Sequence, residues 1–144
     1  MASPVLLQRP GEPHSVSDLH RFPRAVWAAD SSARLGWLLG EAPFEPTPSL
    51  ASNDYQHLRE HALSGQVVTE LPPFLASADI DQGRLCPLLR NHPMPEQVIN
   101  LLYPSRRHPS SIVRAYLDFC QQHAVGYLRL WPHGAIATVS PQHN

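Results

Sequence analysis

The 144-residue sequence contains no lysine and only two cysteines, Cys86 and Cys120. Arginine supplies all 11 basic residues against 12 acidic ones, so the net charge of −1 gives no overall basic surface for nucleic acid or anionic membranes. Two distant cysteines favour reduced thiols in a cytosolic protein, with one disulfide as the arithmetical alternative. The sequence has no apolar run of the ~18 residues that a membrane span needs, and its N-terminus lacks the basic region of a signal peptide. We therefore expect a cytoplasmic protein.

Proline, by contrast, is abundant: its 16 residues are about twice the usual ~5%. Because they are spread along the chain, they favour short elements with stiff connections and argue against a bundle of long helices. Alternating apolar residues predict strands at 24–28, 34–39, 49–51 and 66–71. Strand–helix–strand units joined by short loops predict an α/β domain with a mixed sheet.

Two predicted helices carry clear end signals. Ser15 and Asp18 have the spacing of a capping box for a one-turn helix at 15–20. A second helix is expected from a cap at Ser52 or Asn53 to residue 63, followed by Gly65 as a left-handed C-cap. A third helix is predicted at 109–123, and residues 80–83 are expected to form a turn. The apolar patterns predict a core that includes Trp27, Trp37, Leu50, Leu58, Ala62, Val68 and Leu71.

Residues 57–61, HLREH, match the H-x-x-E-H motif of inverted zinc proteases. In that chemistry His57 and His61 would bind a metal and Glu60 would act as general base, with a third ligand from another helix. No other predicted helix offers an obvious third ligand, and nine histidines make a chance match easy. We therefore favour a solvated helix face. Trp27, Trp37 and Trp131 have two interpretations, a ligand cleft or core packing, of which packing is favoured.

Several stretches together resemble the effector domain of LysR-type transcriptional regulators. Residues 2–23 resemble the family's "sPaYL…G.P…..DL..hp" opening of the second lobe, and residues 53–72 its "nd….l..G.Gia.lP" segment. Residues 82–89 are similar to "G.Lv.lL", and residues 97–119 to the closing "i.lvyP.rr..s..vraFidf". The order and spacing agree over about residues 2–122.

The resemblance implies a partial type II periplasmic-binding-protein-like fold, with one α/β lobe and a C-terminal strand–helix extension. It assigns residues 1–92 to the second lobe of the effector domain and residues 96–124 to the strand and helix that return to the first lobe. Residues 126–144 match nothing in the family, and their alternation suggests a hairpin within 127–139. The sequence contains no helix-turn-helix and most of the first lobe is lacking, so it looks like an excised or shortened piece of a regulator.

The function that the resemblance implies is small-molecule sensing, without enzymatic activity and without a cofactor. An organic acid or an aromatic metabolite would bind between two lobes, while a helix-turn-helix domain outside this sequence would bind DNA. Because open α/β sheets bind ligands where strands meet loops, five residues at such junctions are expected to contact the effector: Asp30, Ser31, Phe44, Asn53 and Val67. The alternatives are an interaction module that pairs with full-length regulators, or a metal-dependent hydrolase that uses the HLREH helix.

A homodimer or larger homo-oligomer is also expected. Residues 97–103 are apolar on both faces, as in an interior strand, and the helix at 109–123 carries a long apolar stripe. The expected interface residues are Val98, Ile99, Leu101, Ile112, Tyr116 and Phe119. Exchange of C-terminal elements between two copies is one way to cover this surface.

Overall fold

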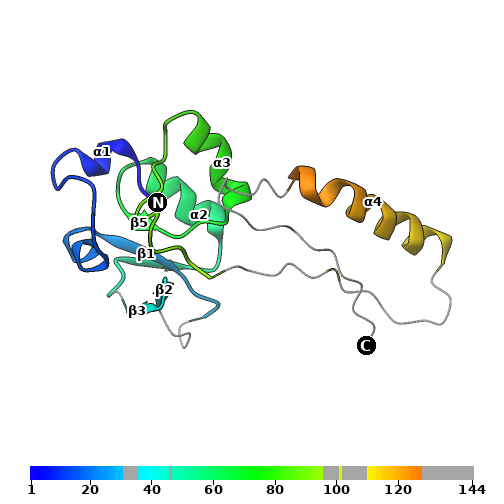
Figure 1. Cartoon of the computed structure of the whole chain (residues 1–144), viewed down its shortest axis with the longest axis horizontal. Helices are drawn as coiled ribbons and strands as arrows, with labels where there is room; N and C mark the ends of the chain where they lie inside the picture. Colours follow the sequence, from blue (N-terminus) through cyan, green and yellow to red (C-terminus); the bar gives the residue numbers. More distant parts are fainter. Residues whose placement is uncertain (31–35, 46, 96–100, 102–109, 128–144) are drawn as a thin grey trace. The chain divides into compact units, whose positions relative to one another are not determined.

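The computed structural model describes residues 1–30, 36–45, 47–95, 101 and 110–127 (Figure 1). The chain divides into two compact units, Met1–Pro95 and Glu96–Asn144, and each is described by itself. The first unit contains the sheets and most of the described helices, and the described residues of the second contain one long helix. The α/β class predicted from the sequence is confirmed.

A three-stranded parallel sheet forms the centre of the first unit. Strand β1 (Arg24–Trp27) lies between β4 (Leu50–Ser52) and β5 (Val68–Thr69). Ala25 pairs with Leu50 on one side and with Thr69 on the other. Because all three strands run in the same direction, their carboxyl ends meet at one edge of the sheet.

A separate antiparallel pair, β2 (Trp37–Leu39) and β3 (Ala42–Phe44), accompanies this sheet. The mixed strand directions that we expected in one sheet are therefore divided between two sheets. Strand β3 was not predicted because Pro43 lies at its centre. Proline is tolerated here since the pair has only two strands, so each is an edge strand.

Alternating residues of β1 face two different apolar clusters. Val26 packs with Val68, Leu19 and Phe22 on one face of the parallel sheet. Ala25 packs on the other face with a cluster from α2, α3 and the chain around them: Leu58, Ala62, Val67, Leu71, Ala76 and Leu85. Ala2 and Cys86 also form a two-hydrogen-bond bridge, with N···O distances of 3.1 and 2.7 Å, which joins the beginning of the unit to a segment close to its end.

The short helices begin and end largely where their caps predict. Helix α1 is Pro4–Leu7, and η1 (Val16–Arg21) is a 3₁₀ helix that begins with the complete Ser15–Asp18 capping box. Helix α2 (Tyr55–Leu63) is capped by the Asp54 carboxylate, not by Ser52 or Asn53, because only Asp54 accepts from the N–H of the helix's second residue. Gly65 has a φ of +77°, which confirms the left-handed C-cap.

Helix α3 (Pro73–Asp81) was missed by the sequence analysis, which expected only a turn at 80–83. The pair Pro72–Pro73 looks like the end of a strand, although β5 already ends at Thr69. Proline is equally suited to the first turn of a helix, where its missing N–H has no intrahelical partner to lose. Pro73 therefore opens α3 after the three residues that follow β5, and Ala76 and Asp79 of this helix are buried.

The predicted core is confirmed for Trp37, Leu58, Ala62, Val68 and Leu71, and Leu50 packs against it partly buried. Trp27 is the exception: it is 37% exposed. It is the last residue of β1, so its side chain lies at the edge of the sheet, where fewer neighbours cover it.

In the second unit, α4 (Ser111–Tyr127) begins two residues later than expected and continues beyond the predicted end at 123. Ile112, Tyr116 and Phe119 are 80%, 58% and 51% exposed. The predicted strand at 97–103 lies outside the described residues except for Leu101, which is 40% exposed. The predicted hairpin within 127–139 also lies outside them, apart from Tyr127 at the end of α4.

Within the described part of the chain, no helix is long and apolar enough to span a membrane.

Candidate functional site

The carboxyl edge of the parallel sheet gathers side chains from three separate parts of the sequence. Trp27 ends β1, Ser52 ends β4, and Thr69 ends β5 with Glu70 directly after it. Open α/β sheets bind ligands outside the carboxyl ends of their strands. This edge is therefore the candidate site of the first unit.

An aromatic pair covers part of the edge. The rings of Trp27 and Tyr55 stack with centroids 6.0 Å apart and planes inclined by 20°. The indole N–H of Trp27 donates to the backbone carbonyl of Asn53 at 3.2 Å, which links the end of β1 to the loop before α2. Because Asp54 caps α2 at its first turn, Tyr55 is fixed at the start of that helix. The edge thus presents a positioned indole that remains partly open to solvent.

Glu70 supplies a carboxylate beside this aromatic pair. Its Oε1 accepts the backbone N–H of Trp27 at 2.9 Å. Burial raises the pKa of Glu70, and the Trp27 N–H and the nearby Trp37 indole oppose that rise only in part. The Trp37 Nε1 is buried and makes no hydrogen bond to any of the described residues. Burial, and then the charge of Glu70, also raise the pKa of Tyr55.

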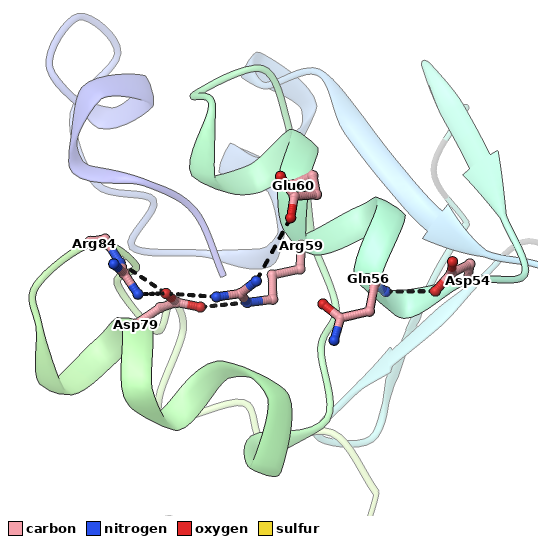
Figure 2. A network of polar contacts seen from close by, with 6 residues as sticks. All are labelled: Asp54, Gln56, Arg59, Glu60, Asp79 and Arg84. Carbon is pink, nitrogen blue, oxygen red and sulfur yellow. Dashed lines mark hydrogen bonds and ion pairs between the residues drawn. The ribbon is translucent and has the colours of Figure 1, made fainter.

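A second polar cluster connects α2 to α3 (Figure 2). The buried Asp79 carboxylate accepts Arg59 Nε at 2.6 Å and Arg59 Nη2 at 3.0 Å. Arg84 donates to the same carboxylate through Nε at 2.9 Å and also through Nη2. The backbone N–H groups of Arg84 and Leu85 donate to the Asp79 carbonyl at 2.7 and 3.2 Å. The two guanidinium groups are both paired with the Asp79 carboxylate. The role of this cluster is therefore to join α2 to α3.

Within the HLREH motif of α2, His57 and Glu60 are exposed and His61 is partly so, whereas Leu58 is buried. The Nε2 atoms of His57 and His61 are 3.3 Å apart, and Nδ1 of His61 is 2.7 Å from Oε1 of Gln66. The residues that the structure describes contain no cluster of three or more metal-ligating side chains. The third ligand that a metal-dependent hydrolase needs is therefore not supplied by the described residues, and nothing in the geometry favours that alternative.

Of the five effector contacts predicted from the sequence, the four that the structure describes are not brought together into one site. Asp30 and Asn53 are exposed near the carboxyl edge, following β1 and β4. Ser31 lies outside the described residues. Phe44 is 5% exposed and stacks on Trp37, with ring centroids 5.8 Å apart. Val67 is 4% exposed and precedes β5, so it lies at the opposite, amino end of that strand.

Sequence reasoning did not include Tyr55 or Glu70 in the site, and it favoured packing over a ligand role for Trp27. The signal that could have identified these residues is their position along the strands. Trp27 is the last residue of β1, and Glu70 directly follows β5, so both lie at the carboxyl edge. The predicted strand 66–71 extends past Glu70 and therefore conceals that it lies after the strand's end.

Residues 1–125 match the protein family described as the LysR substrate binding domain. The chain therefore belongs to this family, the regulatory domain of LysR-type transcription regulators. This confirms the resemblance found in the sequence and its periplasmic-binding-protein-like fold.

Among curated relatives, the chain is 35% identical over 110 residues to the HTH-type transcriptional regulator PtxR of Pseudomonas aeruginosa. This match covers 72% of the chain and 35% of PtxR. The chain is also 29% identical over 128 residues to the HTH-type transcriptional regulator CrgA of Neisseria meningitidis. That match covers 83% of the chain and 41% of CrgA. The chain thus spans well under half the length of these relatives.

Solved structures give the same result for the fold. The regulatory domain of CrgA from Neisseria meningitidis superposes with a TM-score of 0.70 at 26% identity, over 85% of this chain and 61% of that one. The full-length virulence activator AphB of Vibrio cholerae gives a TM-score of 0.69 at 20% identity, over 88% of this chain and 43% of AphB. At that identity the AphB likeness shows the fold alone.

Proposed function

We propose that this chain senses a small-molecule effector for a LysR-type transcription regulator and binds it at the carboxyl edge of the β4-β1-β5 sheet. The single observation that supports this most is the convergence of Trp27, Tyr55 and Glu70 at that edge in a chain of this family. Residues 1–92 act as the second lobe, and residues 96–124 as the return to a first lobe. The regulator acts in the cytoplasm and is not an enzyme.

The chemistry of the edge favours one kind of effector. The indole of Trp27 offers an apolar, electron-rich face to a flat ring or a cation. Glu70 accepts one backbone hydrogen bond in the structure, and its carboxylate has further acceptor capacity for a ligand N–H or O–H. A ligand carboxylate at this point would meet the like charge of Glu70. Of the two effector classes expected from the sequence, an aromatic metabolite with hydrogen-bond donors therefore fits better than a simple organic acid.

The proposed contacts are Trp27, Tyr55 and Glu70, together with the exposed Asp30 and Asn53. Phe44 and Val67 are left out because they are buried among core side chains. Binding of an effector would favour one arrangement of the regulator's subunits, and its DNA-binding domains would follow.

The test is a dose–response curve in the full-length regulator, with transcription from its own promoter as the readout. Trp27→Ala and Glu70→Gln should each raise the effector concentration for half-maximal response by at least tenfold. Glu60→Gln is the matched control, because Glu60 has a 72% exposed carboxylate on the adjacent helix and should leave the curve unchanged. Identical curves for all the variants would contradict the proposed site.

The exposed stripe of α4 supports oligomerisation as a second part of the proposal. Ile112, Tyr116 and Phe119 recur at helical spacing and remain open to solvent. With Val98, Ile99 and Leu101 they form the proposed interface of a homodimer. Sedimentation of Ile112→Glu/Phe119→Glu at micromolar concentration should show a monomer where the unaltered chain shows a dimer, and an unaltered chain that sediments as a monomer would contradict this part.

A further inference from the structure

Two histidines of α2 place their ring nitrogens close together on an exposed part of that helix. His57 and His61 are four residues apart, one turn of helix, and their ring centroids are 4.9 Å apart. Their Nε2 atoms approach to 3.3 Å. His57 is exposed, and His61 is partly so. A solute can therefore approach the two Nε2 atoms from the solvent side of α2.

The separation of the two nitrogens matches the geometry of a shared metal ion. Zinc–nitrogen bonds of about 2.0–2.1 Å that meet at a tetrahedral angle place the two nitrogens ~3.3–3.4 Å apart. The observed 3.3 Å falls in that range without any change in α2.

Gln66 provides an independent observation, because its side-chain oxygen selects the tautomer of the neutral His61 ring. Nδ1 of His61 lies 2.7 Å from the side-chain oxygen of Gln66, which can only accept a hydrogen bond. Nδ1 therefore carries the proton, and the lone pair of His61 is on Nε2. The N–H of Gln66 in turn donates to the His61 carbonyl at 3.1 Å, just after the Gly65 cap. Metal-binding histidines typically have such an oxygen acceptor on their other nitrogen.

We propose that His57 and His61 form a bidentate site for a late divalent transition metal such as Zn²⁺, Ni²⁺ or Cu²⁺. Without metal, Nε2–H of His57 donates to Nε2 of His61. When metal binds, the proton of His57 resides on Nδ1, and both Nε2 atoms become ligands. Water completes the coordination, because the described residues supply no third ligand. Imidazole ligands favour these metals over Mg²⁺ and Ca²⁺, which prefer oxygen.

The test is titration of the 144-residue chain with ZnCl₂ by isothermal calorimetry, with CuCl₂ in a second series and MgCl₂ as the negative control. One ion per chain should bind through this pair. His57→Gln and His61→Gln should each weaken that binding at least tenfold, since each leaves one imidazole. His14→Gln is the matched control, because His14 is also exposed but lies before η1, and it should leave the affinity unchanged. Circular dichroism checks that α2 remains folded in each variant.

Gln66→Met tests the supporting contact. It removes the acceptor for His61 Nδ1 while both imidazoles remain, so it should weaken Zn²⁺ binding by roughly tenfold. The imidazole ¹⁵N spectrum should show Nε2 of His57 and His61 shifting on Zn²⁺ addition. Unchanged affinity in the His57→Gln/His61→Gln double variant, or shifts confined to other histidines, would overturn the proposal. Effector response is not the readout, so the outcome is independent of the proposed function.

Discussion

The first unit withdraws two carboxylates from water, and their environments differ in kind. The Asp79 side chain is fully buried and accepts hydrogen bonds from both Arg59 and Arg84. Burial acts to raise the pKa of Asp79, but the two guanidinium groups outweigh it and the pKa is lowered. Within the described part of the chain Glu70 is paired with no arginine; it accepts the Trp27 N–H and lies near the Met1 ammonium, and burial still raises its pKa.

This difference distinguishes a structural carboxylate from one that is suited to a ligand. Buried polar groups are normally satisfied within the protein, and Asp79 follows that rule on every side. A carboxylate that is buried but only partly satisfied has the perturbed pKa that is typical of functional sites. The carboxyl edge of the sheet, and not the larger ion-pair cluster, is therefore the place to expect chemistry with a solute.

Removal of the structural carboxylate should have the largest effect. Asp79→Ala leaves Arg59, whose side chain is 22% exposed, without its buried partner. Loss of one member of a buried ion pair typically lowers the free energy of unfolding by about 3–5 kcal/mol, and we expect the lower end of that range. Urea denaturation of the 144-residue chain at pH 7, followed by circular dichroism, measures it. A loss under about 1 kcal/mol would show that the cluster does not join α2 to α3.

The two arginines should then differ from each other. Arg59→Met removes two hydrogen bonds from a mostly buried guanidinium and should cost about 1.5–3 kcal/mol. Arg84 has a 52% exposed side chain, so Arg84→Met should cost less than about 1 kcal/mol. The same urea experiment compares them. Equal losses would mean that exposure does not decide the strength of these contacts.

The pH dependence of stability should have opposite signs at the two carboxylates. Because the folded pKa of Glu70 is raised, folding takes up a proton there, and the contribution of Glu70 to the unfolding free energy should increase as pH falls from 7 towards the unfolded value near 4.5. The buried Met1 ammonium, whose pKa is lowered to about 5, contributes with the opposite sign over this range, so the effect of Glu70 is read as the difference between the unaltered protein and Glu70→Gln. Because the folded pKa of Asp79 is lowered, its contribution is present above the unfolded value of 3.8 and is lost at lower pH. Glu70→Gln should abolish the pH dependence that comes from Glu70. At pH 7 it should change the free energy of unfolding by no more than about 1 kcal/mol.

Asp79→Asn should abolish the second effect while leaving the first in place. Thermal denaturation of the three proteins between pH 3 and 7 provides the comparison. A Glu70→Gln variant that follows the unaltered protein across the whole range would contradict the raised pKa.

Glu60→Gln should give the smallest change of all. Glu60 lies 3.9 Å from Arg59, but its side chain is 72% exposed. Surface substitutions of this kind usually stay within about 0.5 kcal/mol. A larger loss would extend the cluster to Glu60, and salt titration would then show whether the additional contact is electrostatic.

The sequence predicts the local parts of this contrast and misses the long-range ones. Capping at Ser15 and the left-handed turn at Gly65 depend on neighbouring residues, so pattern alone finds them. Asp79 could not be predicted as a buried ion-pair partner because Pro72 and Pro73 concealed the helix that carries it. Its partner Arg59 lies 20 residues earlier, and no local pattern links the two.

The candidate site illustrates the same limit. Glu70 reaches the Trp27 N–H across 43 residues of sequence, through a strand pairing that a single chain pattern does not specify. Trp27 is apolar and belongs to a strand, so pattern reasoning assigns it to the core. Only the end of β1 at the sheet edge leaves it partly exposed. Family resemblance, in contrast, depends on many weak signals in order, and it identified the fold correctly.

The bridge between Ala2 and Cys86 has a consequence for how the chain folds during its synthesis. Strand β1 leaves the ribosome before its neighbours β4 and β5, and Cys86 follows later still. Contacts between such distant segments form slowly, because the loop must close before they stabilise anything. The apolar residue Ala25 therefore stays uncovered until Leu50 and the α2 residues that pack on it have been made. A pause in translation before α2 is complete would prolong that exposure, and chaperones would have their longest access to the nascent chain there.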